Sequence, residues 1–195
     1  EGISKSPEGR KVAKPRVLTL RTNAPEDPVL KARRKCVDPC MTFHRLSVMG
    51  QSLHQVYGHL VFSTKDRRNL IGSEIEAELY QYICGMIRDL GSKVIVINGM
   101  PDHVHIIFRA SKSVSDVEFI KQVKGSSSKW LGDKVKGFRW QKGYGWFSVG
   151  AKDLDKAVAY VKGQKEHHKS LSFQDELRGI LRTYDIDFDE RYLWD

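Results

Sequence analysis

Hydrophobic residues recur along the chain with the two periods that separate strands from helices. Short alternating or Val/Ile-rich runs predict strands at 53–64, 93–98, 103–110 and 144–149. Apolar residues at helical spacing predict helices at 73–90, from 115 to just before Gly125, and at 153–168. This order of strand, helix, strand, strand, helix, strand is the split βαβ pattern. The sequence therefore predicts an α+β fold with an antiparallel sheet, helices on one face, and a further C-terminal helix.

Polar residues at the predicted helix starts support these boundaries. Ser73 with Glu76, and Ser115 with Glu118, have the spacing of a capping box. Asp153 is suited to the N-cap position of the last helix, because its carboxylate can accept a hydrogen bond from a free backbone N–H.

Two histidines flank a single valine in the predicted strand at 103–110. Because side chains alternate along a strand, His103 and His105 share one face and Val104 points to the other. Two imidazoles one pleat repeat apart can hold a single divalent cation. Such a triplet also arises by chance in a chain of this composition, so alone it indicates a metal site only weakly.

The predicted helix at 153–168 carries the second group of candidate residues. Tyr160, Gln164 and either His167 or His168 are spaced by one or two turns, so a phenol and an amide can face the same point. The alternative is a half-buried tyrosine beside a solvated glutamine and histidine at a helix end. Gly163 costs about 1 kcal/mol relative to Ala inside a helix, which predicts a loosened helix beside the tyrosine.

Together these residues have the chemistry to cleave a phosphodiester bond. A Mg²⁺ or Mn²⁺ ion held by His103 and His105, with Gln164 as a neutral oxygen ligand, would polarise the scissile phosphate. Tyr160 would attack phosphorus and keep the cut end as a phosphotyrosine, which stores the bond energy for rejoining. A tyrosine hydroxyl has an ordinary pKa of about 10 and needs a proton acceptor. The candidates for this base are His167, His168 or a metal-bound water.

Positive charge is concentrated where aromatic residues lie. The chain has a formal net charge of +9, and residues 112–169 hold 13 Lys and Arg against 6 Asp and Glu. Lysines that follow a phosphate backbone and aromatic rings that stack on bases are typical of single-stranded DNA binding, while a solvated helix face with core aromatics is the alternative. The small, basic segment 124–129 at the predicted helix end could hold phosphates. The candidate DNA contacts are Lys124, Ser126, Ser127, Lys129, Trp130, Lys142 and Lys165.

Length and composition favour a single cytoplasmic domain. The 195 residues suffice for one real core, and the three cysteines are too few and too irregularly spaced for a disulfide framework. No apolar run is long enough to span a bilayer, so no membrane partner is expected. Residues 1–50 contain several prolines and scattered charge with little periodicity. We expect them to form a disordered basic extension, with the folded domain at 51–195.

Six strings between Ser52 and Asp195 stand in the order found in one known family. They are His59–Lys65, Pro101–His105, Val123–Trp130, Trp140–Val149, Tyr160–His168 and Arg191–Asp195. On these strings the chain resembles the single-tyrosine HUH transposases of the insertion-sequence-200/605 type, to which REP-associated tyrosine transposases are related. HUH stands for His-hydrophobic-His.

The resemblance implies a ferredoxin-like fold and a metal-dependent enzyme that cleaves and rejoins single-stranded DNA at hairpin-bearing element ends through a 5′-phosphotyrosine. By position, His103 and His105 match the metal ligands, Gln164 the third ligand and Tyr160 the nucleophile. The family also implies a homodimer in which one subunit's tyrosine serves the other subunit's metal site. Gly163 departs from the family pattern, which has a polar residue there.

Other functions fit parts of the pattern. Passive RNA binding by a split βαβ sheet would leave the histidine pair and Tyr160 unexplained. A histidine-triad enzyme would need a third alternating histidine, where this chain has Ile107. HUH replication initiators and relaxases usually carry further domains. A nickase of that kind, or a domesticated relative that only binds single-stranded DNA or hairpins, remains the alternative.

Overall fold

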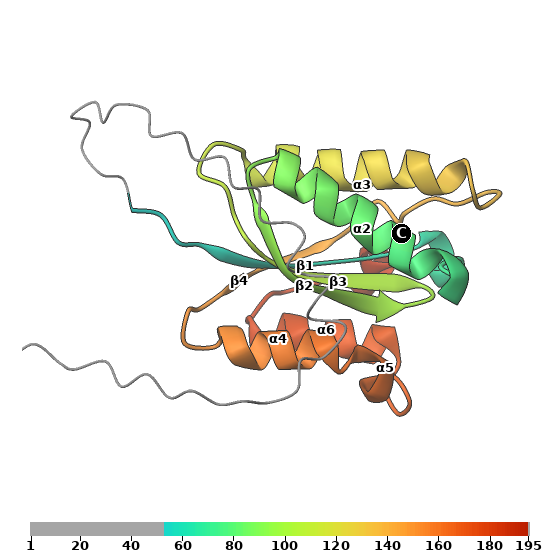
Figure 1. The fold of residues 1–195 in the computed structure, drawn as a ribbon. Helices are drawn as coiled ribbons and strands as arrows, with labels where there is room; N and C mark the ends of the chain where they lie inside the picture. The colour runs from blue at the N-terminus through green and yellow to red at the C-terminus, as the bar shows by residue number, and fades with distance from the viewer. Residues whose placement is uncertain (1–52, 195) are drawn as a thin grey trace, which may run out of the picture. The chain divides into compact units, whose positions relative to one another are not determined.

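The computed structural model describes residues 53–194, which form an α+β fold around one four-stranded antiparallel sheet (Figure 1). The first half contains β1 (Tyr57–Ser63), a short 3₁₀ turn η2 (Lys65–Arg67), α2 (Ser73–Asp89), β2 (Lys93–Met100) and β3 (His103–Arg109). The second half contains α3 (Asp116–Gly132), β4 (Gly145–Val149), α4 (Leu154–Lys162), α5 (Gln164–His167), α6 (Phe173–Thr183) and α7 (Glu190–Leu193). The strand order β2-β3-β1-β4 confirms the predicted split βαβ arrangement.

The two faces of the sheet follow from alternation along its central strands. On β3, Val104, Ile106 and Phe108 are fully buried against the apolar sides of α2 and α3, which form the main core. The intervening positions, His103 and His105 among them, lie on the opposite face, as the alternation predicts. α2 and α3 cover the first face and α4, α5 and α6 the second (Figure 1).

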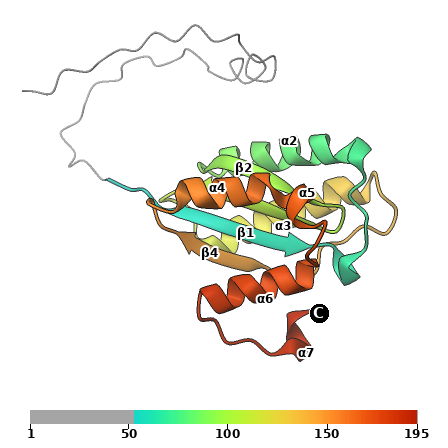
Figure 2. The same cartoon turned by 90° about the horizontal axis from the view of Figure 1, so that it is seen from below.

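The second face is covered by two separate patches of apolar contact. Val161 of α4 packs against Ile107 of β3 and Val149 of β4. α6 packs its apolar side against Val61 of β1 and Phe147 of β4. Figure 2, seen from this side, shows α4 and α6 running on either side of β1. α4, α5 and α6 therefore cover the face of the sheet on which the β3 histidines lie.

Several boundaries differ from the predicted ones. β1 begins at Tyr57, because residues 53–56 are exposed and without regular structure, and β2 extends to Met100. Gly72, and not Ser73, is the N-cap of α2, and no side-chain cap bond forms there. The Ser115 cap of α3 is confirmed by its hydrogen bond from the Glu118 backbone N–H.

Two helices differ from prediction more substantially. α3 does not stop before Gly125 but continues to Gly132, because the buried Ser127 and Leu131 extend its core-facing side. The predicted helix at 153–168 is divided at Gly163, which ends α4 and precedes α5. The loosening expected from this glycine is therefore a complete break in the helix.

Among the described residues, no helix combines the length and apolar character needed to cross a membrane. The predicted basic extension at 1–50 lies outside the described residues.

Candidate metal centre

The histidine pair lies at the start of β3, in a position fixed by its neighbours on both sides. β3 pairs with β1 and β2, and His103 and His105 stand opposite Ser63 and Val61 of β1. In the preceding hairpin, a Cβ at Gly99 would collide with the backbone of His103, so glycine permits the close approach of β2 there. Both imidazoles are consequently buried and held on a rigid backbone.

Each imidazole of this pair is oriented through its Nδ1 atom. His103 Nδ1–H donates to Asp102 Oδ1 at 2.7 Å, because a carboxylate can only accept. His105 Nδ1 lies 3.0 Å from Nε2 of His59, a buried residue of β1. With both Nδ1 atoms engaged, the Nε2 atoms are the ones free to bind a cation. A hydrogen-bonded distal nitrogen is the usual arrangement for metal-binding histidines.

The break at Gly163 places the tyrosine and the glutamine beside this pair. Asn98 Nδ2 of β2 donates to the carbonyls of Val161 and Lys162, both at 3.0 Å, which satisfies the open end of α4. The chain then restarts as α5 with Gln164 fully buried. The Tyr160 ring centroid lies 6.2 Å from that of His105. The structure thus brings together all four residues predicted for the site.

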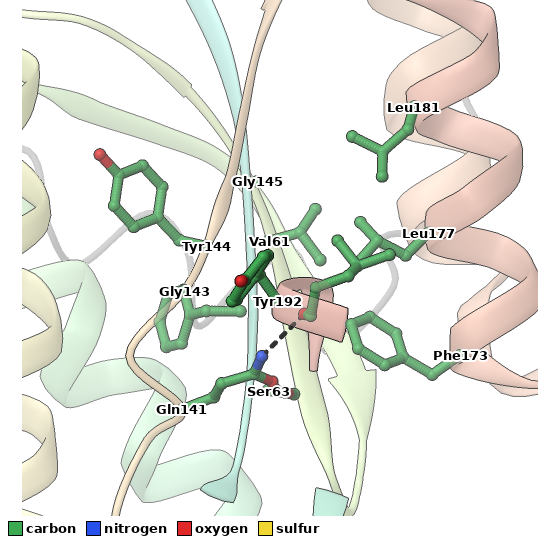
Figure 3. A pocket seen from close by; sticks show the side chains of 12 residues that line it. Val61, Ser63, Gln141, Gly143, Tyr144, Gly145, Phe173, Leu177, Leu181 and Tyr192 are labelled. Atoms are coloured by element: carbon green, nitrogen blue, oxygen red, sulfur yellow. Dashed lines mark hydrogen bonds between the residues drawn. The ribbon is translucent and has the colours of Figure 1, made fainter. Parts of the chain in front are cut away.

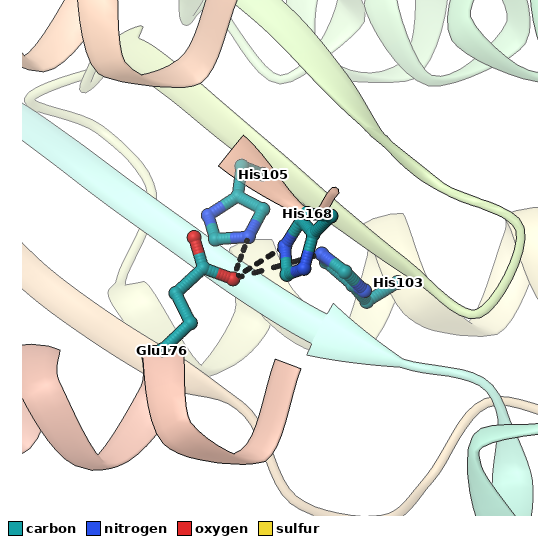
Figure 4. A group of neighbouring side chains, drawn as sticks. All are labelled: His103, His105, His168 and Glu176. Atoms are coloured by element: carbon teal, nitrogen blue, oxygen red, sulfur yellow. Dashed lines mark hydrogen bonds and ion pairs between the residues drawn. The ribbon is translucent and has the colours of Figure 1, made fainter. Parts of the chain in front are cut away.

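A fifth residue, Glu176 of α6, connects this group and was not predicted from the sequence. Its Oε1 accepts hydrogen bonds from the Tyr160 hydroxyl and from Gln164 Nε2, the latter at 2.7 Å. Its Oε2 lies 2.9 Å from His168 Nε2. The same oxygen is 3.4 Å from His105 Nε2 and 3.7 Å from His103 Nε2. Figure 4 shows the Glu176 carboxylate pointing toward the imidazoles of His103, His105 and His168.

The donor atoms of this cluster fit a divalent cation. Among the described residues, the buried side-chain atoms without a hydrogen-bond partner include His103 Nε2, His105 Nε2 and Gln164 Oε1. Buried polar atoms are rarely left unsatisfied, so the two unpartnered Nε2 atoms on one face of β3 indicate a ligand. One ligand atom from each of His103, His105, His168 and Glu176 lies within 4.8 Å of the others. A mixed imidazole and carboxylate set of this kind suits a divalent metal.

Burial sets the charge states in the cluster. Burial, reinforced by the neighbouring His105, lowers the pKa of His59 to about 3, and burial also lowers the pKa of His105. Burial by itself would raise the pKa of Glu176, but His105 and the hydrogen bonds from Tyr160 and Gln164 outweigh it and hold that pKa below its usual value. Burial and the contact with Glu176 raise the pKa of the Tyr160 hydroxyl. These shifts favour a neutral His59, an ionised Glu176 and a protonated Tyr160.

One cavity opens onto the cluster, and another lies beside it. The first, of about 390 Å³, is lined by His59, Tyr160, His167 and Glu176, so Tyr160 and the Glu176 carboxylate face open space. The second, of about 220 Å³, lies between β1, β4 and α6 (Figure 3). Its wall includes Phe173, whose ring stacks on His103 at 4.3 Å between centroids. The first cavity therefore opens onto Tyr160 and Glu176, whereas the second approaches His103 only through Phe173.

The candidate bases differ in their surroundings. His168 donates from Nδ1 to the Leu171 carbonyl at 2.8 Å, and its Nε2 faces Glu176. His167 lies with its ring centroid 5.4 Å from that of Tyr160, but the tyrosine hydroxyl is bonded to Glu176. The group nearest to the Tyr160 proton is thus the Glu176 carboxylate, which was not among the bases predicted from the sequence.

Because α3 continues to Gly132, the predicted DNA contacts do not gather at a helix end. Ser127 is wrong as a DNA contact, because it is fully buried, donates to the Val123 carbonyl at 2.6 Å and accepts from Trp140 Nε1. Segment 124–129 lies within the helix and not at its end, so it presents no phosphate-binding terminus. Lys165 is paired with Glu76 at 2.7 Å. The remaining candidates, Ser126, Lys129, Trp130 and Lys142, are half-buried or exposed.

Lys124 has a structural role that the sequence did not indicate. Its ammonium donates to the carbonyls of Gln141, Lys142 and Gly143 at 2.8, 3.0 and 2.6 Å, and thereby holds the loop before β4. Burial lowers the pKa of Lys124 to about 8.

Lys124→Ala should therefore lower the free energy of unfolding by about 2 kcal/mol, because three carbonyls, that of Gln141 partly buried, lose their charged donor. Urea denaturation followed by circular dichroism measures this change. The control Lys121→Ala, on the same helix with a side chain 77% exposed, should shift it by less than about 0.5 kcal/mol. Equal stabilities for the two variants would show that the Lys124 bonds contribute little.

The chain is similar in sequence to known proteins. The family model described as "Transposase IS200 like" matches residues 52–164. The ISDra2 transposase TnpA of Deinococcus radiodurans is 29% identical over 77 residues, which cover 40% of this chain and 55% of that protein. The chain thus spans about half the length of this curated relative.

The chain also matches solved structures. A REP-associated tyrosine transposase bound to a REP hairpin has a TM-score of 0.50 and 16% identity, over 67% of this chain and 76% of that one. A crystal structure of a candidate transposase from Deinococcus radiodurans R1 has a TM-score of 0.48 and 20% identity, over 61% and 98%. His168 and Glu176 lie beyond the segment that the family model matches.

Proposed function

Because this chain belongs to the family of IS200-like transposases, we propose that it cleaves and rejoins single-stranded DNA through a covalent phosphotyrosine. The observation that carries the proposal is the position of Tyr160 beside His105, on the face of β3 where the Nε2 atoms of His103 and His105 are buried without a partner. Gln164 and Tyr160 are bonded to the same carboxylate oxygen there. A passive nucleic-acid-binding protein has no need of such a cluster. The proposed substrate is single-stranded DNA carrying hairpins at the ends of an insertion element.

The proposed roles follow from the contacts. His103, His105 and Gln164 would hold a Mg²⁺ or Mn²⁺ ion. Such an ion, when bound, polarises a phosphate and offsets charge on its oxygens. Asp102 and His59 orient the two imidazoles through their Nδ1 atoms. The cavity that opens onto Tyr160 provides a place for the scissile phosphate.

The chemical step balances as a transfer between two oxygens. The Tyr160 hydroxyl loses its proton and its oxygen forms a bond to phosphorus, while the bond from phosphorus to the 3′ oxygen of the DNA breaks. The departing 3′ oxygen takes up a proton, and the 5′ end stays attached to Tyr160. Attack by another 3′ hydroxyl on this phosphotyrosine reverses the step and joins two DNA ends.

The family resemblance also implies a homodimer with shared active sites. The described chain already brings Tyr160 to its own histidines, so the proposed chemistry can be completed within one chain. A dimer is therefore a separate part of the proposal, which the cleavage step does not require. DNA contacts are proposed at the exposed basic positions Lys129 and Lys142, together with Ser126 and Trp130.

Incubation with labelled DNA tests the function directly. The purified protein is mixed with single strands containing the end hairpins of its own element, with Mn²⁺ or Mg²⁺, and resolved on a denaturing gel. We expect a covalent protein–DNA adduct with single strands, none with the matched duplex, and none with a chelator. Hairpin binding without an adduct would favour the domesticated binding protein. Nicking of duplex DNA would favour the replication-initiator or relaxase alternative.

A further inference from the structure

The segment that follows the family-matched region returns to the metal centre. After α5, a short turn leads into α6, and the two elements place His168 and Glu176 against the histidines of β3. Glu176 is only 3% exposed although it is an acidic residue on a helix of otherwise amphipathic character. An isolated buried carboxylate is unfavourable unless it is paired or binds a metal.

The hydrogen bonds around this carboxylate leave one oxygen facing nitrogen atoms. Oε1 is occupied by the Tyr160 hydroxyl and Gln164 Nε2. Oε2 is the oxygen directed at the imidazoles, with His168 Nε2 2.9 Å away and the two β3 histidines at 3.4 and 3.7 Å.

Two of the facing imidazoles are oriented through Nδ1. His168 carries a proton on Nδ1, because that atom donates to the Leu171 carbonyl. His103 does the same, because its Nδ1 donates to Asp102. The Nε2 atoms of both residues are therefore the ones directed at Glu176 Oε2, at 2.9 and 3.7 Å. A buried carboxylate oxygen among ring nitrogens needs a positive charge between them, which a bound cation supplies.

We propose that Glu176 and His168 are additional ligands of the cation held by His103, His105 and Gln164. The inference rests on the proposed function, since it assumes the metal centre described there. It adds an anionic oxygen and a third imidazole from outside the family-matched segment. Glu176 then links α6 to the sheet through the ion and keeps the Tyr160 hydroxyl beside it through Oε1.

Metal affinity tests this proposal without any DNA. Mn²⁺ binding to the full chain is measured by isothermal titration calorimetry for the wild type, Glu176→Gln and His168→Ala. Each substitution should weaken Mn²⁺ binding at least tenfold, as expected when a metal site loses an interaction it depends on. Glu166→Gln, which makes the same charge change on an exposed side chain of α5, should bind Mn²⁺ as the wild type does.

Pulsed electron paramagnetic resonance separates a ligand from a residue that only supports the site. Bound Mn²⁺ in the wild type should show coupling to three imidazole nitrogens, and His168→Ala should remove one of them. A residue that acts only by positioning would leave the nitrogen count at the ion unchanged. Circular dichroism confirms that each variant is folded. If Glu176→Gln fails to fold, Glu176→Asp, which keeps the charge at a shorter reach, replaces it and should also weaken binding.

The outcomes distinguish the two proposals. Wild-type affinity and an unchanged nitrogen count in the Glu176 and His168 variants, with binding lost in His105→Ala, would overturn this inference and leave the proposed metal centre intact. The cluster would then be an ion pair between Glu176 and a protonated His168. A wild-type protein that binds no Mn²⁺ would overturn both the inference and the metal part of the proposed function.

Discussion

Tyr160→Phe is expected to abolish the covalent protein–DNA adduct, by roughly 10⁴-fold or more, while DNA binding persists. The substitution removes the only atom proposed to form the bond to phosphorus and leaves the ring in place. The measurement is adduct yield on a denaturing gel, with DNA affinity determined in parallel by fluorescence anisotropy. The loss should appear in yield and not in affinity.

Tyr184→Phe provides the matched control for this variant. Tyr184 lines the same 390 Å³ cavity, and its hydroxyl donates to the Ser148 carbonyl at 2.8 Å instead of approaching the histidines. Its removal should leave adduct yield within about twofold of the wild type. An adduct that survives in Tyr160→Phe would identify a different nucleophile and refute the assignment.

His105→Ala is expected to abolish both Mn²⁺ binding and DNA cleavage. It removes a donor atom from the middle of the site, on a strand that cannot readjust because it is paired on both sides. We expect at least a hundredfold loss of cleavage. Removal of the metal from the wild type with a chelator should reproduce the loss of cleavage. Added Mn²⁺ should then restore cleavage in the wild type but not in His105→Ala. His54→Ala, at an exposed position before β1, is the control and should retain both activities.

A mixture of Tyr160→Phe and His105→Ala also tests whether subunits share active sites. Tyr160→Phe lacks the tyrosine hydroxyl and His105→Ala lacks one of the proposed metal ligands. The mixture therefore regains cleavage only if the tyrosine of one chain serves the histidines of another. Because Tyr160 and His105 lie together within one chain, we expect no recovery. Recovery in the mixture would support the shared homodimer that the family resemblance implies. Cleavage by His105→Ala alone would refute the role of the histidine pair.

The residues predicted from the sequence were those whose spacing fixes their geometry. Alternation placed His103 and His105 on one face of a strand, and helical spacing placed Tyr160 and Gln164 one turn apart. The spacing of residues within one strand or one helix does not depend on how the rest of the chain packs. The helix break at Gly163 alters the path of the chain after Lys162, but Gln164 still reaches the same site.

Glu176 was missed because its position depends on tertiary structure. It lies twelve residues after Gln164 on another helix, and no periodicity relates the two. One signal was available, since Phe173, Leu177 and Leu181 form the apolar stripe of α6 and Glu176 interrupts it. An acidic residue at a core-facing position indicates a paired or metal-bound carboxylate. His59 and Asp102 were likewise visible in the sequence, but nothing there showed that they touch the ligands.

The error in α3 has a simple physical origin. Gly125 costs a helix about 1 kcal/mol, which suggested a terminus. The residues after it, however, include Leu131 in the core and Ser127, whose hydroxyl joins the helix to Trp140. Burial of a leucine contributes roughly 1.5–3 kcal/mol and outweighs the glycine. The same burial removed Ser127 from the surface available to DNA.

The pairing of β3 on both sides gives the parts of the candidate site unequal local stability. Amide hydrogens of a strand held between two neighbours exchange with solvent only on extensive unfolding, whereas short helices joined at a glycine open more readily. We therefore expect the backbone amides of His103 and His105 to exchange more slowly than that of Tyr160. On gentle heating, Tyr160 should detach from the site while the histidines stay in register. A cleavage activity that depends on Tyr160 should then be lost before the sheet unfolds.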